Sequence, residues 1–168
     1  MAIVLIGFMG VGKTTIGKAL AQKMQIPFID LDAEIMKKEG KSISQIFETK
    51  GEKYFRALEC ESLKAYINMN VVIATGGGII ENTNNIELLK KNKLNFWVDT
   101  NIYSVYNRIV GDVNRPNAQN KSFDEIKKLY NSRISRYNEI AYIKVYNENS
   151  VSSSVQEIHN QIIANDEN

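Results

Sequence analysis

The start of the chain constrains its fold more than any other segment. Residues 3–20 read IVLIGFMGVGKTTIGKAL, which is an apolar stretch, a glycine-rich turn ending in Lys-Thr, and a helical pattern. The turn matches G-x-x-x-x-G-K-[ST], whose glycines let backbone N–H groups converge on phosphate oxygens at the start of a helix. The segment therefore predicts a strand–loop–helix unit that binds the phosphates of a nucleotide.

Two side chains of this loop carry specific chemistry. Lys13 is expected to reach the β- and γ-phosphates, and the hydroxyl of Thr14 to ligate Mg²⁺. The loop residues expected to contact the nucleotide are Gly10, Val11, Gly12, Lys13, Thr14 and Thr15.

Short apolar segments alternate with helical patterns along the rest of the chain. The expected strands lie within residues 2–7, 27–32, 71–78, 94–100 and 143–147, and the expected helices within residues 13–24, 44–67, 84–91, 102–109, 123–141 and 155–164. Segments rich in β-branched and aromatic residues suit a parallel sheet that is buried on both faces. We expect an α/β fold of three layers, α/β/α, around a central five-stranded parallel sheet, with the site at the carboxyl ends of the strands.

The composition fits one soluble intracellular domain over residues 1–168. The chain has 168 residues, 43% of them hydrophobic, and can bury one substantial core. Its formal charge of +2 gives no strong electrostatic case for nucleic acid or a membrane surface. No apolar run approaches the roughly 20 residues that span a bilayer. The single cysteine, Cys60, fits a reducing compartment. We expect a cytoplasmic monomer without nucleic-acid or membrane partners.

A polar segment separates two of the expected helices. Residues 111–122, GDVNRPNAQNKS, show no hydrophobic periodicity and contain one of the two prolines. We interpret this segment as a mobile lid. It carries Arg115, and an arginine on a closing loop can neutralise charge on a phosphoryl group during transfer.

Two aspartates end the second apolar segment, in FIDLD. If the backbone stays extended through both positions, Asp30 and Asp32 share one face. One could then help to position Mg²⁺ while the other faces a second substrate. The alternative is an aspartate that caps a helix, followed by a solvated acid.

The other candidates describe a pocket for a small acceptor. In FRALE, Arg56 and Glu59 are spaced i, i+3 on a helix, so Glu59 could aim the guanidinium at a ligand carboxylate, although a surface ion pair is the alternative. The glycines at 76–78 would let backbone N–H groups approach a ligand, or they form a strained turn with positive φ. Arg133 lies on a late helix. Together these groups suit an acceptor with a hydroxyl and a carboxylate.

Six motifs, in order across almost the whole chain, resemble those of one family. They are GFMGVGKTT, DLD, FRALE, ATGGG, NRP and RISRYNEIA. The phosphate loop is generic, whereas the combination of D-x-D, F-R-x-x-E, T-G-G-G and R-P is much more specific. The chain resembles the shikimate kinases, within the nucleoside-monophosphate-kinase-like P-loop proteins. The resemblance implies Mg²⁺-dependent transfer of a phosphoryl group from ATP to the 3-hydroxyl of shikimate, a step in aromatic amino-acid biosynthesis.

The resemblance also implies a role for each candidate residue. The catalytic residues would be Lys13, Asp32 and Arg115, with Asp32 as the base. Thr14 and Asp30 would bind Mg²⁺. Arg108 would lie against the adenine and Arg115 on the ATP phosphates. The residues implied to bind shikimate are Asp32, Arg56, Gly76, Gly77, Gly78 and Arg133. Residues 31–60 would form the acceptor-binding segment of a single kinase domain, and residues 111–122 its lid.

The sequence departs from the family pattern in two places. The segment NENSVSSS lacks the proline often found in the adenine loop, and the motif R-x-P-x-Y reads RISRY. The closest alternative function is a related kinase for gluconate or a nucleoside monophosphate. An alternative of another class is a nucleotide-dependent regulator without phosphotransfer, which would need no acceptor pocket.

Overall fold

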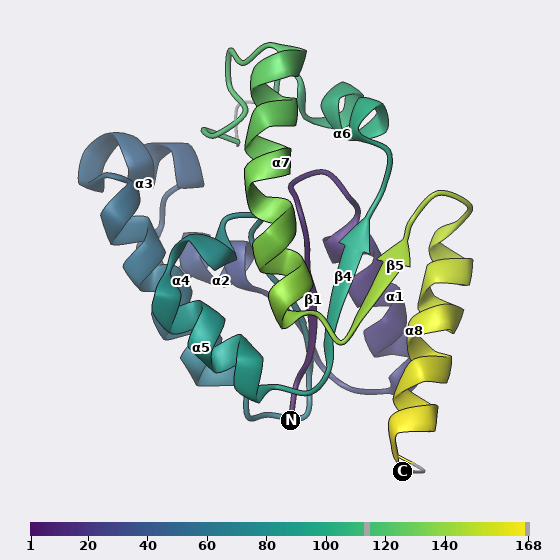
Figure 1. Ribbon diagram of the computed structural model, residues 1–168. Helices are drawn as coiled ribbons and strands as arrows, with labels where there is room; N and C mark the ends of the chain where they lie inside the picture. The colour runs from purple at the N-terminus through teal and green to yellow at the C-terminus, as the bar shows by residue number, and fades with distance from the viewer. Residues whose placement is uncertain (113–114, 167–168) are drawn as a thin grey trace.

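Five parallel strands form the centre of the structure, a computed structural model that describes residues 1–112 and 115–166 (Figure 1). The strand order is β2-β3-β1-β4-β5, and every pair of neighbours is parallel. In chain order the elements are β1 (Ile3–Ile6), α1 (Lys13–Met24), β2 (Phe28–Asp30), α2 (Leu31–Glu39), α3 (Ile43–Lys50), α4 (Glu52–Tyr66), β3 (Val72–Ala74), the 3₁₀ helix η1 (Ile79–Glu81), α5 (Thr83–Lys91), β4 (Asn95–Asp99), α6 (Ile102–Ile109), α7 (Phe123–Ile140), β5 (Ile143–Tyr146) and α8 (Val151–Asp166).

Helices cover both faces of the sheet. Helices α1 and α8 pack together on one face, whereas α4, α5 and α7 lie on the other face, in front of the strands in Figure 1. The strands β1, β3 and β4 are buried along their whole length, because side chains on both sides of each strand meet a helical layer. The prediction of a three-layer α/β fold with five parallel strands is confirmed. No helix in the described ranges is both long and apolar enough to cross a membrane.

The segment after β2 differs from the extended conformation expected for it. Asp30 ends β2 and is also the N-cap of α2, where its Oδ1 accepts a hydrogen bond from the backbone N–H of Ala33 at 3.2 Å. Asp32 therefore lies in the first turn of α2, and the expected alternation of the two aspartates along a strand is wrong. The helix-cap alternative is correct for Asp30, because a carboxylate there satisfies an N–H group that has no partner within the helix.

A second difference concerns the helix expected over residues 44–67. The structure has two helices there, α3 and α4, which meet at Gly51. Gly51 has φ 81° and ψ 165°, a conformation far from that of a helix, so the chain changes direction at this residue. Figure 1 shows α3 projecting from the side of the sheet, with α4 leading back to it. The last helix also begins earlier than expected, at Val151, where the Ser150 Oγ accepts from the N–H of Ser153.

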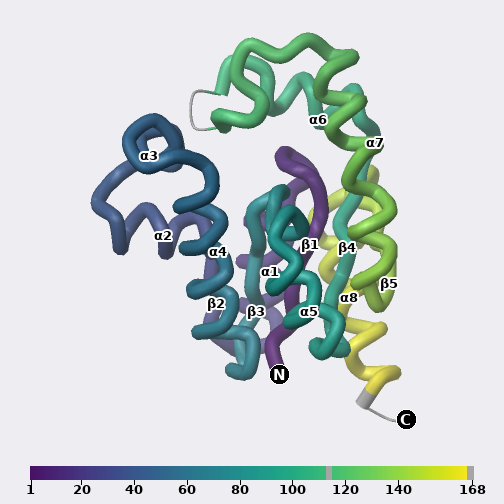
Figure 2. Tube along the Cα trace, turned by 60° about the vertical axis from the view of Figure 1, so that its left-hand side comes forward, coloured from purple at the N-terminus to yellow at the C-terminus, as the bar shows by residue number. Residues whose placement is uncertain are grey.

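The segment expected to form a lid connects α6 to α7. In Figure 2 the described residues of this segment lie above the end of β1. Turns form over its described part, with the carbonyl of Arg115 accepting from the N–H of Ala118 at 2.8 Å. Val113 and Asn114 lie outside the described residues. The segment ends at Ser122, which forms a capping box with Glu125 and so fixes the start of α7.

Alanine at Gly51 tests whether this residue sets the break between α3 and α4. Residues with a Cβ essentially avoid its conformation, so we expect Gly51→Ala to lower the free energy of unfolding by about 1–3 kcal/mol in urea denaturation. If one helix ran through the position, alanine would instead stabilise it by about 0.5–1 kcal/mol.

Gly40→Ala is the matched control. A Cβ at either glycine meets no atom within 4 Å, so only the backbone conformation differs between the two sites. Gly40 has φ 63° and ψ 24°, the left-handed helical region, where alanine costs about 1 kcal/mol. The loss at Gly51 should exceed the loss at Gly40, and a smaller loss would contradict the backbone explanation.

Candidate active site

The loop between β1 and α1 is held in place by its carbonyl oxygens. Arg108 Nη1 donates to the carbonyl of Gly10 at 3.0 Å, and Asn147 Nδ2 donates to the carbonyl of Val11 at 2.9 Å. Lys13 Nζ donates to two further loop carbonyls, those of Gly7 and Phe8, both at 2.7 Å. A loop fixed in this way keeps its N–H groups available for an anion at the start of α1.

Gly12 shows why the loop needs glycine next to its lysine. Its φ is 100°, and a Cβ there would lie 2.5 Å from Asn147 Nδ2. Any other residue would be strained in its backbone and would push away the amide that holds Val11. The sequence pattern contains this glycine, but nothing in the pattern pointed to Asn147, which comes from the end of β5.

Two cavities meet at the carboxyl ends of the strands. One, of about 220 Å³, follows the phosphate loop and includes Lys13 and Arg108 in its lining. The other, of about 370 Å³, extends between α2, α3, α4 and α7 and includes Arg56 and Arg133. Both cavities are lined by Met9, Thr14, Asp30, Asp32, Gly76, Gly77 and Arg115.

The predicted residues divide between the two cavities as follows. Gly10 and Gly12 line the smaller cavity, and Gly78 lines the larger one. Neither lining includes Val11, which is fully buried, or Thr15, which is exposed on α1.

Burial changes the charge state of Lys13. Its side chain lies among the loop carbonyls and is 7% exposed. Burial lowers its pKa to about 7, although the charges of Asp32 and Asp30 oppose this shift. Nucleotide phosphates in the smaller cavity would restore a full positive charge on the lysine, because an anion stabilises the protonated form.

Thr14 and Asp30 form a pair of oxygen atoms at the junction of the cavities. The Thr14 hydroxyl donates to Asp30 Oδ2 at 2.7 Å, while the other carboxylate oxygen of Asp30 caps α2. Hydroxyl, carboxylate and phosphate oxygens are the ligands that Mg²⁺ prefers. These two side chains therefore fit a magnesium ion that is held mainly by nucleotide phosphates.

Asp32 reaches the junction from the first turn of α2. Its Oδ1 atom is buried and has no hydrogen-bond partner within the described part of the chain. Burial, reinforced by the charge of Asp30, raises the pKa of Asp32 to about 6. The solvated acid considered as an alternative is thus wrong, and Asp32 is a carboxylate with an oxygen available for a proton donor.

Arg56 is fixed by carboxylates of its own helix. Its Nη1 contacts Glu59 at 2.5 Å and its Nη2 contacts Glu52 at 2.9 Å. Glu59 is fully buried, so this is not the surface ion pair considered as an alternative. Burial raises the pKa of Glu59, and the guanidinium of Arg56 opposes the rise.

The three glycines that follow β3 are required by close packing. None of the residues 76–78 has a positive φ, so the strained-turn alternative is wrong. A Cβ on Gly76 would lie 2.7 Å from Glu59 Oε1 and 2.9 Å from Asp32 Oδ1, and a Cβ on Gly78 would collide with the guanidinium of Arg56. The glycines thus make room for charged side chains as well as for a ligand.

The other predicted arginines lie at or near the cavities. Arg133 is 3% exposed and extends from α7 into the larger cavity, and Arg115 lines both cavities and pairs with Asp112 at 2.8 Å. Two further contacts that the sequence did not indicate tie α7 to the glycine segment. The Tyr137 hydroxyl donates to the carbonyl of Gly77, and Glu81 accepts from Arg133.

Comparisons with known proteins show which family the chain is similar to. A family model described as shikimate kinase matches residues 9–164. A shikimate kinase from Macrococcus caseolyticus is 66% identical over 168 residues, which cover 100% of both chains.

Two solved structures extend the similarity to three dimensions. The structure of shikimate kinase from Acinetobacter baumannii in complex with shikimate has a TM-score of 0.93 at 34% identity, and the match covers 98% of this chain and 93% of that chain. Shikimate kinase from Aquifex aeolicus has a TM-score of 0.86 at 41% identity and 98% coverage of both chains. The chain therefore belongs to the shikimate kinase family, the enzymes that transfer a phosphoryl group from ATP to the 3-hydroxyl of shikimate in aromatic amino-acid biosynthesis.

Proposed function

We propose that this chain transfers the phosphoryl group from ATP to the 3-hydroxyl of shikimate at the place where its two cavities meet. The observation that supports this most directly is the shared lining: Thr14, Asp30, Asp32 and Arg115 border both cavities. A phosphoryl group passing from a nucleotide in the smaller cavity to an acceptor in the larger one would cross this shared region. Transfer in line then requires little movement of either substrate.

The nucleotide side combines the loop with three cations. The N–H groups of the loop and Lys13 bind the phosphates, Arg108 lies against the adenine, and Arg115 neutralises charge on the transferred group. Thr14 and Asp30 hold Mg²⁺, which when bound draws negative charge from the phosphate oxygens.

On the acceptor side, Asp32 orients the 3-hydroxyl of shikimate and takes its proton. The buried Oδ1, which has no hydrogen-bond partner among the described residues, supports this role, and so does a pKa of about 6, which keeps the carboxylate ionised at neutral pH while making it a better base than an exposed aspartate. Arg56 and Arg133 bind the shikimate carboxylate, with the residues Gly76, Gly77 and Gly78 along the same wall.

We further propose a single kinase domain with two specialised segments. Residues 31–60 supply the acceptor side, and residues 111–122 close over the cavities and exclude water, which suppresses hydrolysis of ATP. The described residues of one chain line both cavities, which suits a monomer. Aromatic amino-acid biosynthesis and the single cysteine suit the cytoplasm.

The acceptor is tested first by a coupled assay of ADP release with Mg-ATP. The reactions contain shikimate, gluconate, a set of nucleoside monophosphates, or no acceptor. We expect turnover well above background with shikimate alone, because two arginines and an aspartate match its carboxylate and hydroxyl. Turnover with gluconate or a nucleoside monophosphate instead would contradict shikimate as the acceptor. Background rates with every acceptor would favour a nucleotide-dependent regulator.

Asp32→Asn should abolish most turnover without preventing nucleotide binding. The amide cannot accept the hydroxyl proton, and loss of a general base typically costs a factor of about 10²–10⁴ in rate. We expect kcat to fall by at least about 100-fold, with little change in the affinity for a fluorescent ATP analogue. Asp124→Asn, at an exposed aspartate of α7, is the control. Near-normal turnover by the Asp32→Asn variant would rule out Asp32 as the general base.

The pH profile provides an independent check on Asp32. Its pKa is raised to about 6, so the carboxylate gains a proton and loses its function as pH falls through this value. We expect kcat/KM for shikimate at saturating Mg-ATP to decline as pH falls on the acid side of neutrality, because protonated Asp32 cannot accept the hydroxyl proton. Circular dichroism at each pH separates this decline from acid unfolding. A profile that stays flat down to pH 5 in folded protein would be inconsistent with the assignment.

A further inference from the structure

Arg133 has a guanidinium that is only partly used by the protein. Its side chain is almost completely buried and its guanidinium carbon lies 5.6 Å from the centre of the Phe8 ring. Its Nε donates to Glu81 Oε1 at 2.8 Å. Its Nη1 is buried and has no hydrogen-bond partner among the described residues. Burying such a donor without a partner is costly, and Arg133 lines the larger cavity, so its guanidinium keeps hydrogen-bonding capacity for a ligand there.

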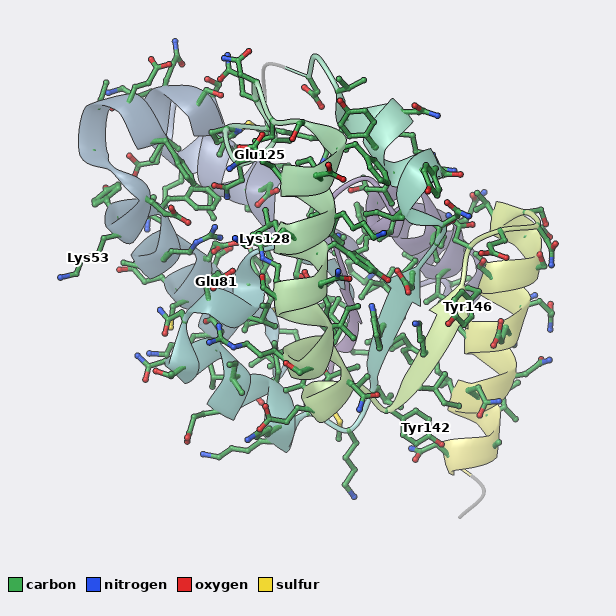
Figure 3. All side chains as sticks on the ribbon, turned by 45° about the horizontal axis from the view of Figure 1, so that its top comes forward. Lys53, Glu81, Glu125, Lys128, Tyr142 and Tyr146 are labelled. Atoms are coloured by element: carbon green, nitrogen blue, oxygen red, sulfur yellow. The ribbon has the colours of Figure 1, made fainter. Side chains whose placement is uncertain are left out.

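Glu81 is itself held on both sides. It is the last residue of η1, and η1 directly follows the glycines that line the larger cavity. Figure 3 shows Glu81 beside α7. Its second oxygen, Oε2, accepts from Arg136 Nη1 at 3.3 Å, and the same Nη1 donates to the carbonyl of Ile80 at 3.2 Å. Arg136 therefore limits the rotation of the Glu81 carboxylate.

The two arginines of the larger cavity are fixed in different ways. Arg56 contacts two glutamates of its own helix, at i−4 and i+3. The positions three and four residues from Arg133 on α7 are Leu129, Tyr130, Arg136 and Tyr137, and none of them is acidic. A carboxylate for Arg133 must therefore come from another element, and Glu81 supplies it.

We infer that Glu81 is a positioning residue for substrate binding. By accepting from the Nε of Arg133, it fixes the plane of the guanidinium at the wall of the larger cavity, where the terminal nitrogens of the guanidinium bind the carboxylate of the acceptor. This inference rests on the proposed function, in which Arg133 binds the carboxylate of shikimate. Nothing in the sequence motifs assigns a role to Glu81, which follows the glycine run as the last letter of GGGIIE.

Glu81→Gln tests this role by removing the charge while keeping the size. The readouts are the Kd for shikimate by calorimetry, the KM values for shikimate and ATP, and the melting temperature. We expect the Kd and KM for shikimate to rise about tenfold, because a charge-assisted hydrogen bond no longer fixes Arg133. The KM for ATP should stay within about twofold, and the melting temperature within about 2 °C.

Glu139→Gln is the matched control. Like Glu81, Glu139 joins α7 to another element: it lies on α7 and pairs with Lys90 of α5 at 2.5 Å, but this pair is exposed and does not line the larger cavity. It should change none of the four readouts. A lower melting temperature of Glu81→Gln with an unchanged shikimate Kd would show that Glu81 only joins η1 to α7, and would overturn the inference.

A double-mutant cycle tests whether Glu81 affects shikimate binding through Arg133. Lysine has no atom equivalent to Nε, so Glu81→Gln should add less than about twofold to the shikimate Kd of Arg133→Lys. A full tenfold increase in that background would overturn the inference, because Glu81 would then act without Arg133. If Glu81→Gln does not fold, Arg136→Gln frees the same carboxylate; a higher shikimate Kd is expected, and an unchanged Kd would overturn the inference.

The wild-type chain separates this inference from the proposed function. If wild type neither binds nor phosphorylates shikimate, the proposed function itself fails. If wild type does both and Glu81→Gln binds shikimate normally, only the role of Glu81 fails.

Discussion

The register of three neighbouring strands brings the whole site together. Strand β3 lies between β1 and β2, with Ala74 opposite Leu5 on one side and Asp30 on the other. The chain leaves these strands at the same level, so the phosphate loop, the glycine segment and the start of α2 emerge side by side. Parallel pairing makes this possible because every strand has its carboxyl end at one edge. A shift of one residue would separate the phosphate loop from the carboxylates that it must face.

The cations of the site are held by the protein in two ways. Lys13 bonds to loop carbonyls, and Arg115 bonds to an aspartate in its own segment between α6 and α7, so both can exchange these partners for phosphate oxygens. Arg56 and Arg133 instead contact glutamates at the wall of the larger cavity, which both arginines line. The first arrangement suits groups that follow a moving phosphoryl group. The second suits a fixed recognition site, because the orientation exists before the ligand arrives.

The sequence predicted the strands, the layers and the family, because these depend on local patterns of apolar residues and on motifs with fixed spacing. It did not predict α2, since the sequence interpretation of FIDLD is a strand that continues, and an aspartate that ends the strand and caps a helix is only the alternative. The break at Gly51 was missed because one glycine within a helical pattern is often tolerated. Glu81 and Asn147 were missed for another reason: each acts on a residue more than fifty positions away, and no local pattern records such a contact.

The glycine segment after β3 limits which substitutions could make this enzyme resistant to an inhibitor. Its backbone is pressed against Asp32, Glu59 and Arg56 so closely that a single methyl group would displace them. A competitive inhibitor that rests on this stretch of main chain would contact atoms common to all amino acids. Single substitutions there could not remove the contact without also moving the charged groups needed for substrate. Resistance would therefore have to arise elsewhere, in side chains around the rim.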